Sequence, residues 1–372
     1  MSKPQIIFMA TGAFAVPSMR RLWESGEFEI GGLVTAPLKY TRSGDTIPTP
    51  ARQFAEEVGL YVFETDDIHA LELFDFLYLV RPEHLFVCDF GKILPNSLLR
   101  APRIGGINLH GSMLPKYRGA APVHWAILNG DEFTGVSIIR MTTEVDAGPV
   151  IAQSQPIPIG PRETTLELEE RLADYGAEMV LDIVRKLSGT EHVKILPQLA
   201  SEVSKAPKIK KEDGLIDWTK SSSAVFNHYR AMFPWPRSFT DWKRDNDSVL
   251  RLIIGSMLPL DDRLHKLVGP SDYSAPIYVE PILIDAKLDN LAEIRLTAKG
   301  SESTKSTLKP ASSRRPDSWT PGTVIEASGN RLIVAAGEGA VQIFQIQPSG
   351  KRPMDTEAFL RGYPIKVGDR FM

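Results

Sequence analysis

The sequence is poor in the residues that form covalent or metal cross-links. Among its 372 residues only Cys88 is a cysteine, so an internal disulfide and a cysteine-based metal cluster are both excluded. No apolar run reaches the ~18 residues that a transmembrane helix requires. The N-terminus has neither the apolar core of a secretory signal nor an Arg-rich transit pattern. We therefore predict a cytoplasmic protein that does not enter a membrane.

Several cofactor and nucleophile motifs are also missing. The turn after the first expected strand, Ala10-Thr-Gly12, lacks the G-x-G-x-x-G fingerprint, which disfavours NAD or FAD. The seven histidines show no spacing typical of metal ligands, so no metal is predicted. No Ser or Cys stands beside a base in a nucleophile-elbow pattern, so a covalent acyl-enzyme is not indicated.

The charge is nearly balanced but unevenly distributed. The net charge of the whole chain is -3, which does not by itself indicate nucleic-acid binding. Residues 1–208 hold 20 Lys and Arg against 26 Asp and Glu, whereas residues 209–372 hold 23 against 20. The second part is therefore mildly basic, as expected either of a surface that meets a polyanion or of an ordinary solvated surface.

The order of the apolar runs predicts two domains. A strand at 6–9, a helix at 16–25 and a strand at 30–34 form a β-α-β opening, which favours an α/β domain with a parallel sheet. Short strands at turn-like spacing in the second part favour a small β-barrel. We predict a first domain over residues 1–205 and a second over 206–372. Further helices are expected at 49–58, 122–128, 164–187 and 222–232, and strands at 61–63, 85–88, 136–141, 239–242, 250–254, 321–325, 332–335 and 341–344.

An amide, an imidazole and a carboxylate stand amid glycines and prolines between residues 107 and 148. Asn108 and His110 are two residues apart, so on a strand they project from one face. Asp146 follows the expected buried strand at 136–141. Asn can donate to a developing oxyanion, His can carry a proton near neutral pH, and Asp can orient the His or accept a proton. The set fits acyl or formyl transfer to an arriving nucleophile, although a satisfied Asn and His beside a turn would give the same pattern.

The wider motif resembles the 10-formyltetrahydrofolate-dependent formyltransferases. The matching residues are Asn108-Leu-His110-Gly-Ser-Met-Leu-Pro115-Lys-Tyr-Arg118-Gly119-Ala-Ala-Pro122, Thr134-Gly135-Val136 and Asp146-Ala-Gly148. The resemblance implies a Rossmann-like domain in which Asn108 and His110 polarise the formyl group and Asp146 assists proton movement. It also implies folate contacts from a turn and a loop, made by Ser112, Met113, Leu114, Pro115, Gly91, Ile93 and Leu94. The sequence departs from the family at the first turn, where the usual Gly-Thr-Pro is Ala10-Thr11-Gly12.

The second part resembles the family members that formylate methionyl initiator tRNA. The matching pieces are Ile216-Asp-Trp218, Phe233-Pro-Trp-Pro236, Pro321-Gly-Thr323 and Gln345-Ile-Gln-Pro348-Ser-Gly-Lys-Arg-Pro-Met354. In those members this domain is a barrel resembling the OB fold that helps to hold the tRNA. The resemblance also makes Arg42 the counterpart of a loop residue at the acceptor end. We predict tRNA contacts from Arg42 and from the linker lysines Lys205, Lys208, Lys210 and Lys211.

An insertion at about 256–317 departs from the family pattern. Residues 282–287 and 292–296 suggest an added hairpin, and residues 300–316 are rich in Ser, Thr, Lys and Arg. A tolerated surface insertion and an RNA-contacting segment both remain open.

Together these features predict a monomeric, metal-independent enzyme that transfers the formyl group of 10-formyltetrahydrofolate to methionyl initiator tRNA. Three alternatives remain open at this stage. The same motif could formylate an amino sugar or another small amine, or hydrolyse formyltetrahydrofolate with water as the acceptor. A nucleic-acid-binding protein could also keep the fold without catalysis.

Overall fold

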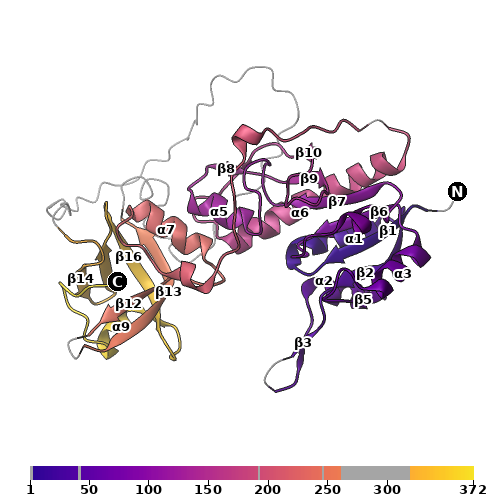
Figure 1. Ribbon diagram of the computed structural model, residues 1–372. Helices are drawn as coiled ribbons and strands as arrows, with labels where there is room; N and C mark the ends of the chain where they lie inside the picture. Colours follow the sequence, from indigo (N-terminus) through magenta and orange to yellow (C-terminus); the bar gives the residue numbers. More distant parts are fainter. Residues whose placement is uncertain (1–2, 41–42, 192, 245–246, 261–318) are drawn as a thin grey trace, which may run out of the picture.

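The computed structural model describes residues 3–40, 43–191, 193–244, 247–260 and 319–372. The hairpin expected within the insertion, and Arg42, lie outside these ranges. The described chain forms two bodies, one built on a mostly parallel sheet and one on a curled antiparallel sheet (Figure 1). No helix in these ranges is long and apolar enough to cross a membrane.

The first body is organised around a seven-stranded sheet. Its strands are β1 (Gln5–Ala10), β2 (Glu29–Thr35), β5 (Val62–Glu64), β6 (His84–Cys88), β7 (Gly105–His110), β9 (Ser137–Arg140) and β10 (Val150–Gln153), in the order β10-β9-β7-β6-β1-β2-β5. The five strands from β5 to β7 are parallel, as predicted. At the other edge β9 pairs antiparallel with β7, and β10 pairs antiparallel with β9. The expectation of a parallel sheet therefore holds for five strands, and the antiparallel β9 brings the chain back alongside β7.

Helices cover both faces of this sheet. They are α1 (Val16–Glu24), α2 (Pro50–Glu57), α3 (Leu71–Val80), α4 (Asn96–Leu99), α5 (Pro122–Leu128) and α6 (Thr165–Ser188). Side chains alternate across a strand, so Ile6 and Phe8 pack with α1 and α6, whereas Ile7 and Met9 pack with α3. Helix α6 begins at a capping box, in which Thr164 and Glu167 satisfy each other's backbone N–H groups.

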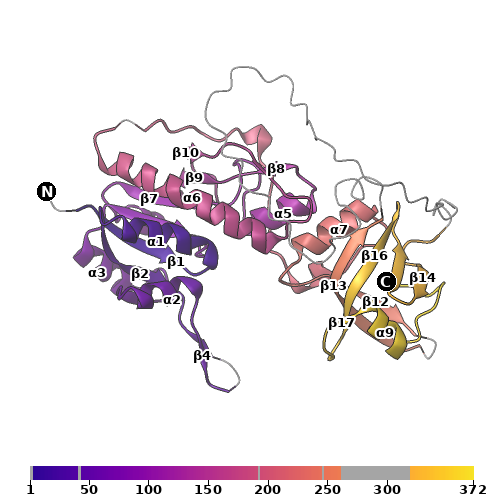
Figure 2. The same cartoon turned by 180° about the vertical axis from the view of Figure 1, so that it is seen from behind.

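Two short antiparallel pairs complete the first body. Strands β8 (Phe133–Thr134) and β11 (Ile157–Pro158) form one pair. Strands β3 (Lys39–Tyr40) and β4 (Thr46–Ile47) form the other, and this pair projects away from the sheet (Figure 2).

The second body is a curled antiparallel sheet. Its strands are β12 (Phe239–Lys243), β13 (Val249–Pro259), β14 (Val324–Ser328), β15 (Arg331–Ala335), β16 (Ala340–Pro348) and β17 (Met354–Asp355). They follow the order β12-β13-β16-β15-β14, with β17 paired to β16. Near the C-terminus Phe371 pairs with Trp242 and Arg370 pairs with Thr323, so the chain end bridges both edges of the curl. The prediction of a Rossmann-like domain followed by a small barrel resembling the OB fold is confirmed.

The two bodies are joined by polar contacts as well as by the chain. Helix α7 (Ser222–Ala231) packs against α5, and α9 (Thr356–Gly362) covers the second sheet. The buried guanidinium of Arg230 donates to the carbonyls of Gly160 and Glu163, just before α6. The linker includes the 3-10 turns η2 (Ala200–Glu202) and η3 (Lys211–Gly214). Ile209 belongs to the first core and Ile216 to the second, so the chain crosses between the bodies over residues 209–216.

Candidate active site

Strand β7 carries Asn108 and His110 to the carboxyl end of the parallel sheet, next to β6 and β9. This is the edge at which open α/β sheets bind ligands. His110 is buried, with 6% of its surface exposed, and Asn108 is half-buried. As the spacing predicted, both side chains point the same way, toward the loop that carries Asp146.

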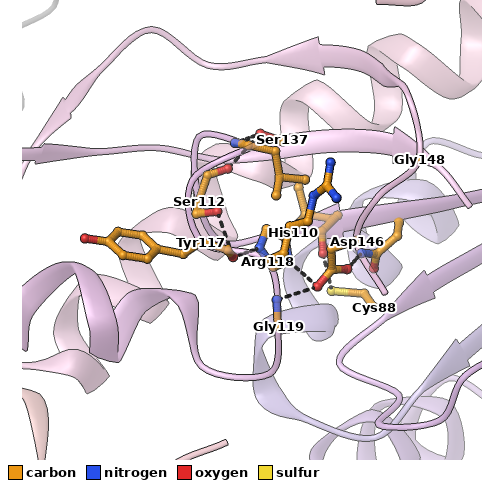
Figure 3. Close-up of polar contacts among 12 residues, drawn as sticks. Cys88, His110, Ser112, Tyr117, Arg118, Gly119, Ser137, Asp146 and Gly148 are labelled. Atoms are coloured by element: carbon orange, nitrogen blue, oxygen red, sulfur yellow. Dashed lines mark hydrogen bonds and ion pairs between the residues drawn. The ribbon is translucent and has the colours of Figure 1, made fainter. Parts of the chain in front are cut away.

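The structure brings Asn108, His110 and Asp146 together, and Figure 3 shows His110 beside Asp146. The Asn108 amide donates to Asp146 Oδ1 over 3.4 Å, and His110 Nδ1 lies 3.6 Å from Asp146 Oδ2. The other ring nitrogen, Nε2, is 2.8 Å from the carbonyl of Tyr117. A carbonyl only accepts, so the neutral ring is assigned its proton on Nε2. Nδ1 is then the free base, and a proton added there would face the Asp146 carboxylate.

The Asp146 carboxylate is held from the opposite side by the backbone of the glycine-rich motif. The amide of Gly119 donates to Asp146 Oδ2 over 2.9 Å. Gly119 has φ 131°, and a Cβ there would lie 2.3 Å from the carbonyl of Ala206. Glycine is required at this position because the linker passes so close. The conformation of the motif and the path of the linker thus jointly fix one oxygen of Asp146.

The segment of Ser112 to Pro115 is anchored by hydrogen bonds to the turn that follows it and to β9. Ser112 Oγ donates to the carbonyl of Lys116 over 2.7 Å, and Leu114 N donates to Ser137 Oγ over 3.0 Å. Ser112 and Leu114 are buried, whereas Met113 and Pro115 are half-buried. Only the latter two therefore keep side-chain surface that a ligand could contact.

The predicted folate-contacting residues of the loop after β6 are also partly exposed and partly buried. Ile93 is 62% exposed and Gly91 is exposed, with φ 72°. Leu94 is 1% exposed and packs with α3 and α4 residues in the core. The buried position of Leu94 gives its side chain a packing role, so Gly91 and Ile93 are the members of this predicted set that face outward.

Three ionisable groups near this edge have no counterpart among the residues predicted from sequence. Burial, together with a smaller effect of the charge of Asp89, raises the pKa of Glu169 on α6 to about 7. Burial lowers the pKa of His124 on α5 to about 4, although His124 Nδ1 lies 3.8 Å from Glu169. At neutral pH His124 is therefore uncharged, and this contact is no ion pair. The three groups come from separate segments of the chain, so no spacing in the sequence indicates that they lie close together.

The predicted tRNA-contacting lysines lie on the linker and are exposed: Lys205, Lys208, Lys210 and Lys211. Lys205 and Arg118 border a hollow of about 460 Å³ together with residues 144, 145 and 147 of the Asp146 loop. Lys205 thus lies near the loop that carries Asp146. Within the described ranges, no group of three or more His, Cys, Asp or Glu side chains could hold a metal.

Known families match both bodies. The family described as "Formyl transferase" matches residues 6–184, and "Formyl transferase, C-terminal domain" matches residues 208–268 and 291–364. A methionyl-tRNA formyltransferase from Enterococcus faecalis is 31% identical over 368 residues, covering 98% of each chain. One from Moorella thermoacetica is 31% identical over 366 residues, again covering 98% of each chain.

Solved structures share the fold at lower identity. HypX from Aquifex aeolicus in complex with tetrahydrofolic acid has a TM-score of 0.56 and 16% identity, covering 98% of this chain and 48% of its own. WlaRD, a sugar 3N-formyl transferase solved in the presence of dTDP and 5-N-formyl-THF, has a TM-score of 0.54 and 17% identity, covering 95% and 100%. At these identities the likeness concerns the fold alone.

Proposed function

The chain belongs to the formyl transferase family, and from this premise we propose that it transfers the formyl group of 10-formyltetrahydrofolate to the amino group of methionyl initiator tRNA. The observation that carries the proposal is the convergence of Asn108, His110 and Asp146 at the ligand-binding edge of the sheet. The names of its full-length relatives support methionyl-tRNA as the acceptor. The match to these relatives covers 98% of the chain and so includes the second body.

The donor supplies a formyl carbon bound to its N10 nitrogen. In the proposed reaction the neutral amine attacks this carbon, a new C–N bond forms, and the bond to N10 breaks as N10 takes up the proton that the amine has lost. The Asn108 amide donates a hydrogen bond to the formyl oxygen as negative charge develops there. The amide is neutral and already fixed by Asp146, so little reorganisation accompanies the step.

His110 and Asp146 handle the proton that the acceptor nitrogen must lose. Nδ1 is the free base of the neutral ring, so it accepts this proton directly or through water. The resulting imidazolium donates from Nε2 to the carbonyl of Tyr117 and from Nδ1 toward Asp146 or the formyl oxygen. Asp146 stabilises that cation and, with its second oxygen, keeps Asn108 oriented.

We further propose that the folate ring lies against the outward face of Gly91 and Ile93, with Met113 and Pro115 opposite. These residues flank the edge at which β6 and β7 end, and they keep exposed or half-buried surface. The linker lysines and Arg42 are proposed to contact tRNA phosphates, which supply affinity and register more than specificity. The protein is proposed to act as a monomer in the cytoplasm.

An amino sugar or another small amine is the second candidate acceptor. The motif is compatible with it, and solved sugar formyltransferases share the fold. The purified protein separates the candidates when it is given 10-formyltetrahydrofolate with charged initiator tRNA, with an amino sugar nucleotide, or with water alone. Formyl transfer to the sugar in preference to the tRNA would contradict the proposal.

A further inference from the structure

A side chain of the linker reaches back to the loop that carries Asp146. Gln198 lies between α6 and the second body, and its side chain is half-buried. Its Nε2 group donates to the carbonyl of Asp146 and to the carbonyl of Gly148, each over 2.7 Å. Its Oε1 atom accepts from Nε of Arg118 over 2.9 Å. Both amide hydrogens and the amide oxygen are therefore engaged with the catalytic region.

The backbone that Gln198 holds is in a conformation that needs support. Asp146 has φ 49°, in the left-handed region that residues other than glycine rarely adopt. Gly148, two residues on, lies so close to β9 that a Cβ there would be 1.8 Å from the carbonyl of Arg140. The Asp146 loop is thus pressed against β9 on one side and tied to Gln198 through two carbonyls. Releasing that tie would let the loop relax toward ordinary backbone angles.

The Gln198 side chain also contacts the segment that donates to the Asp146 carboxylate. Arg118 immediately precedes Gly119, whose amide donates to the Asp146 carboxylate. The linker runs beside Arg118, since Arg118 N donates to the carbonyl of Ser204 over 2.8 Å and Ala206 N donates to the carbonyl of Arg118 over 2.7 Å. Gln198 therefore connects the backbone of Asp146 to the segment that donates to its side chain.

We propose that Gln198 is a positioning residue for formyl transfer, which holds the Asp146 carboxylate within reach of Asn108 and His110. The kinetic part of this inference rests on the proposed function. The structural part does not, because it concerns only the geometry of the Asp146 loop. Gln198 touches no reacting atom, and it acts through the two carbonyls and through Arg118.

Two variants and one control isolate this role. Gln198→Met keeps the length of the side chain and removes all three hydrogen bonds. Gln198→Glu keeps the acceptor for Arg118 but loses both donors while it is ionised. Gln347→Glu is the matched control, because Gln347 in β16 also donates to a carbonyl, that of Lys351, and accepts from an arginine, Arg237. Its site lies in the second body, away from Asp146.

The first measurement is amide hydrogen exchange at Gly119 in the full-length protein without substrates. The Gly119 N–H bonds to the Asp146 carboxylate, so a looser carboxylate exposes it to exchange. We expect exchange at least ~10-fold faster in Gln198→Met and unchanged in Gln347→Glu. Unchanged exchange at Gly119 in Gln198→Met would overturn the proposal whether or not the wild-type protein formylates tRNA.

The second measurement is steady-state formyl transfer across pH. Gln198→Met should lower kcat by ~10-fold or more, with the KM for the formyl donor within about threefold of wild type. For Gln198→Glu, the ratio of variant to wild-type kcat should rise as pH falls toward 5, because protonating Glu restores one donor. The same ratio for Gln198→Met should stay flat. A folded Gln198→Met protein with wild-type kcat, or a flat ratio for Gln198→Glu, would overturn the positioning role. Inactivity of the wild type toward tRNA would instead contradict the proposed function.

Discussion

His110 Nδ1 and Asp146 Oδ2 lie 3.6 Å apart, longer than a strong hydrogen bond, while His110 Nε2 is fixed at 2.8 Å from the carbonyl of Tyr117. One side of the imidazole is thus committed to the backbone, and the other faces a carboxylate across a short gap. A proton that arrives on Nδ1 would turn this gap into a charge-assisted contact. In the proposed mechanism the ring and the carboxylate act as one proton-accepting unit.

Replacing Asp146 tests that unit. Asp146→Asn keeps the size of the side chain, and its oxygen can still accept from Gly119, but it carries no charge to stabilise the imidazolium. We expect turnover to fall by ~10²-fold or more, as is usual for groups in acid–base or oxyanion roles. The measurement is kcat for formyl transfer, with circular dichroism as the control for folding. A folded Asp146→Asn enzyme with near-normal turnover would remove the carboxylate from the mechanism.

Asn108→Ala and His110→Ala address the other two members. Each should reduce kcat by a similar ~10²-fold. Asn108→Ala removes the proposed donor to the formyl oxygen, and His110→Ala removes the proposed base. The double variant Asn108→Ala with Asp146→Asn should lose less than the product of the two single effects, since their side chains bond each other. Fully multiplicative losses would show that the two residues act independently.

The close approach of the linker to Gly119 gives a stability prediction. Gly119→Ala should lower the free energy of unfolding by ~3 kcal/mol or more, because it combines an unfavourable φ with a clash against the carbonyl of Ala206. Gly59→Ala is the matched control, since Gly59 also has a positive φ, 72°, but has open space around its Cβ position. It should cost only ~1 kcal/mol. Equal losses of unfolding free energy in Gly119→Ala and Gly59→Ala, measured by urea unfolding, would show that the linker moves aside at no cost.

A buried histidine far from the site predicts acid sensitivity. His84 is fully buried, its Nε2 lies 2.9 Å from Ser188 Oγ, and burial lowers its pKa to about 4. The unfolded chain has the ordinary pKa near ~6.5, so it binds the proton first, and stability is lost as pH falls from ~6.5 toward 4. The free energy of unfolding lost through His84 approaches ~3 kcal/mol as the pH nears ~4.

The measurement is urea unfolding of wild type and His84→Gln at several pH values between 7 and 4.5. The variant should lose less stability on acidification, whatever its stability at pH 7. His124 shifts in the same direction as His84, whereas the raised pKa of Glu169 acts oppositely, because its stability contribution is lost as pH rises through about 7. Wild type and His84→Gln both contain His124 and Glu169, so the effects of these two groups cancel in the difference between the proteins. Parallel pH curves would contradict a neutral His84 in the folded protein.

The exposed linker lysines predict a salt-sensitive contribution to acceptor binding. Lys208→Glu should raise the KM for aminoacyl-tRNA several-fold, leave the KM for the folate donor unchanged, and reduce the salt slope of tRNA binding by ~1. Lys3→Glu makes the same change of charge beside the amino end of β1, away from the ligand-binding edge. If Lys3→Glu alters tRNA binding as much as Lys208→Glu, only the overall charge matters.

The sequence predicted the parts of the fold that depend on local pattern. The β-α-β opening, helices α5, α6 and α7, and most strands of the second sheet lie where the apolar runs indicated. The spacing of Asn108 and His110 gave their common direction, because alternation along a strand is a local property. Helix α3 was missed, since its sequence LELFDFLYLV is largely apolar and shows no clear helical stripe.

The supporting residues of the site could not be found in the same way. Gln198 acts on Asp146 across 52 positions of the chain, and Gly119 is needed because the linker passes against it. Glu169 lies near His124 and Asp89 only because residues of α6, α5 and the loop after β6 come together in the fold. Such contacts arise from tertiary packing, and a single sequence carries no spacing that reveals them.

The central proposal is formyl transfer from 10-formyltetrahydrofolate to methionyl initiator tRNA at the site of Asn108, His110 and Asp146. The most direct test incubates the purified full-length protein with 10-formyltetrahydrofolate and charged initiator tRNA and follows the formyl-methionyl product, with Asp146→Asn in parallel. We expect rapid formylation by the wild type and a loss of ~10²-fold or more in the variant. Absence of formyl-methionyl-tRNA with the wild type, or equal rates for the two proteins, would contradict it.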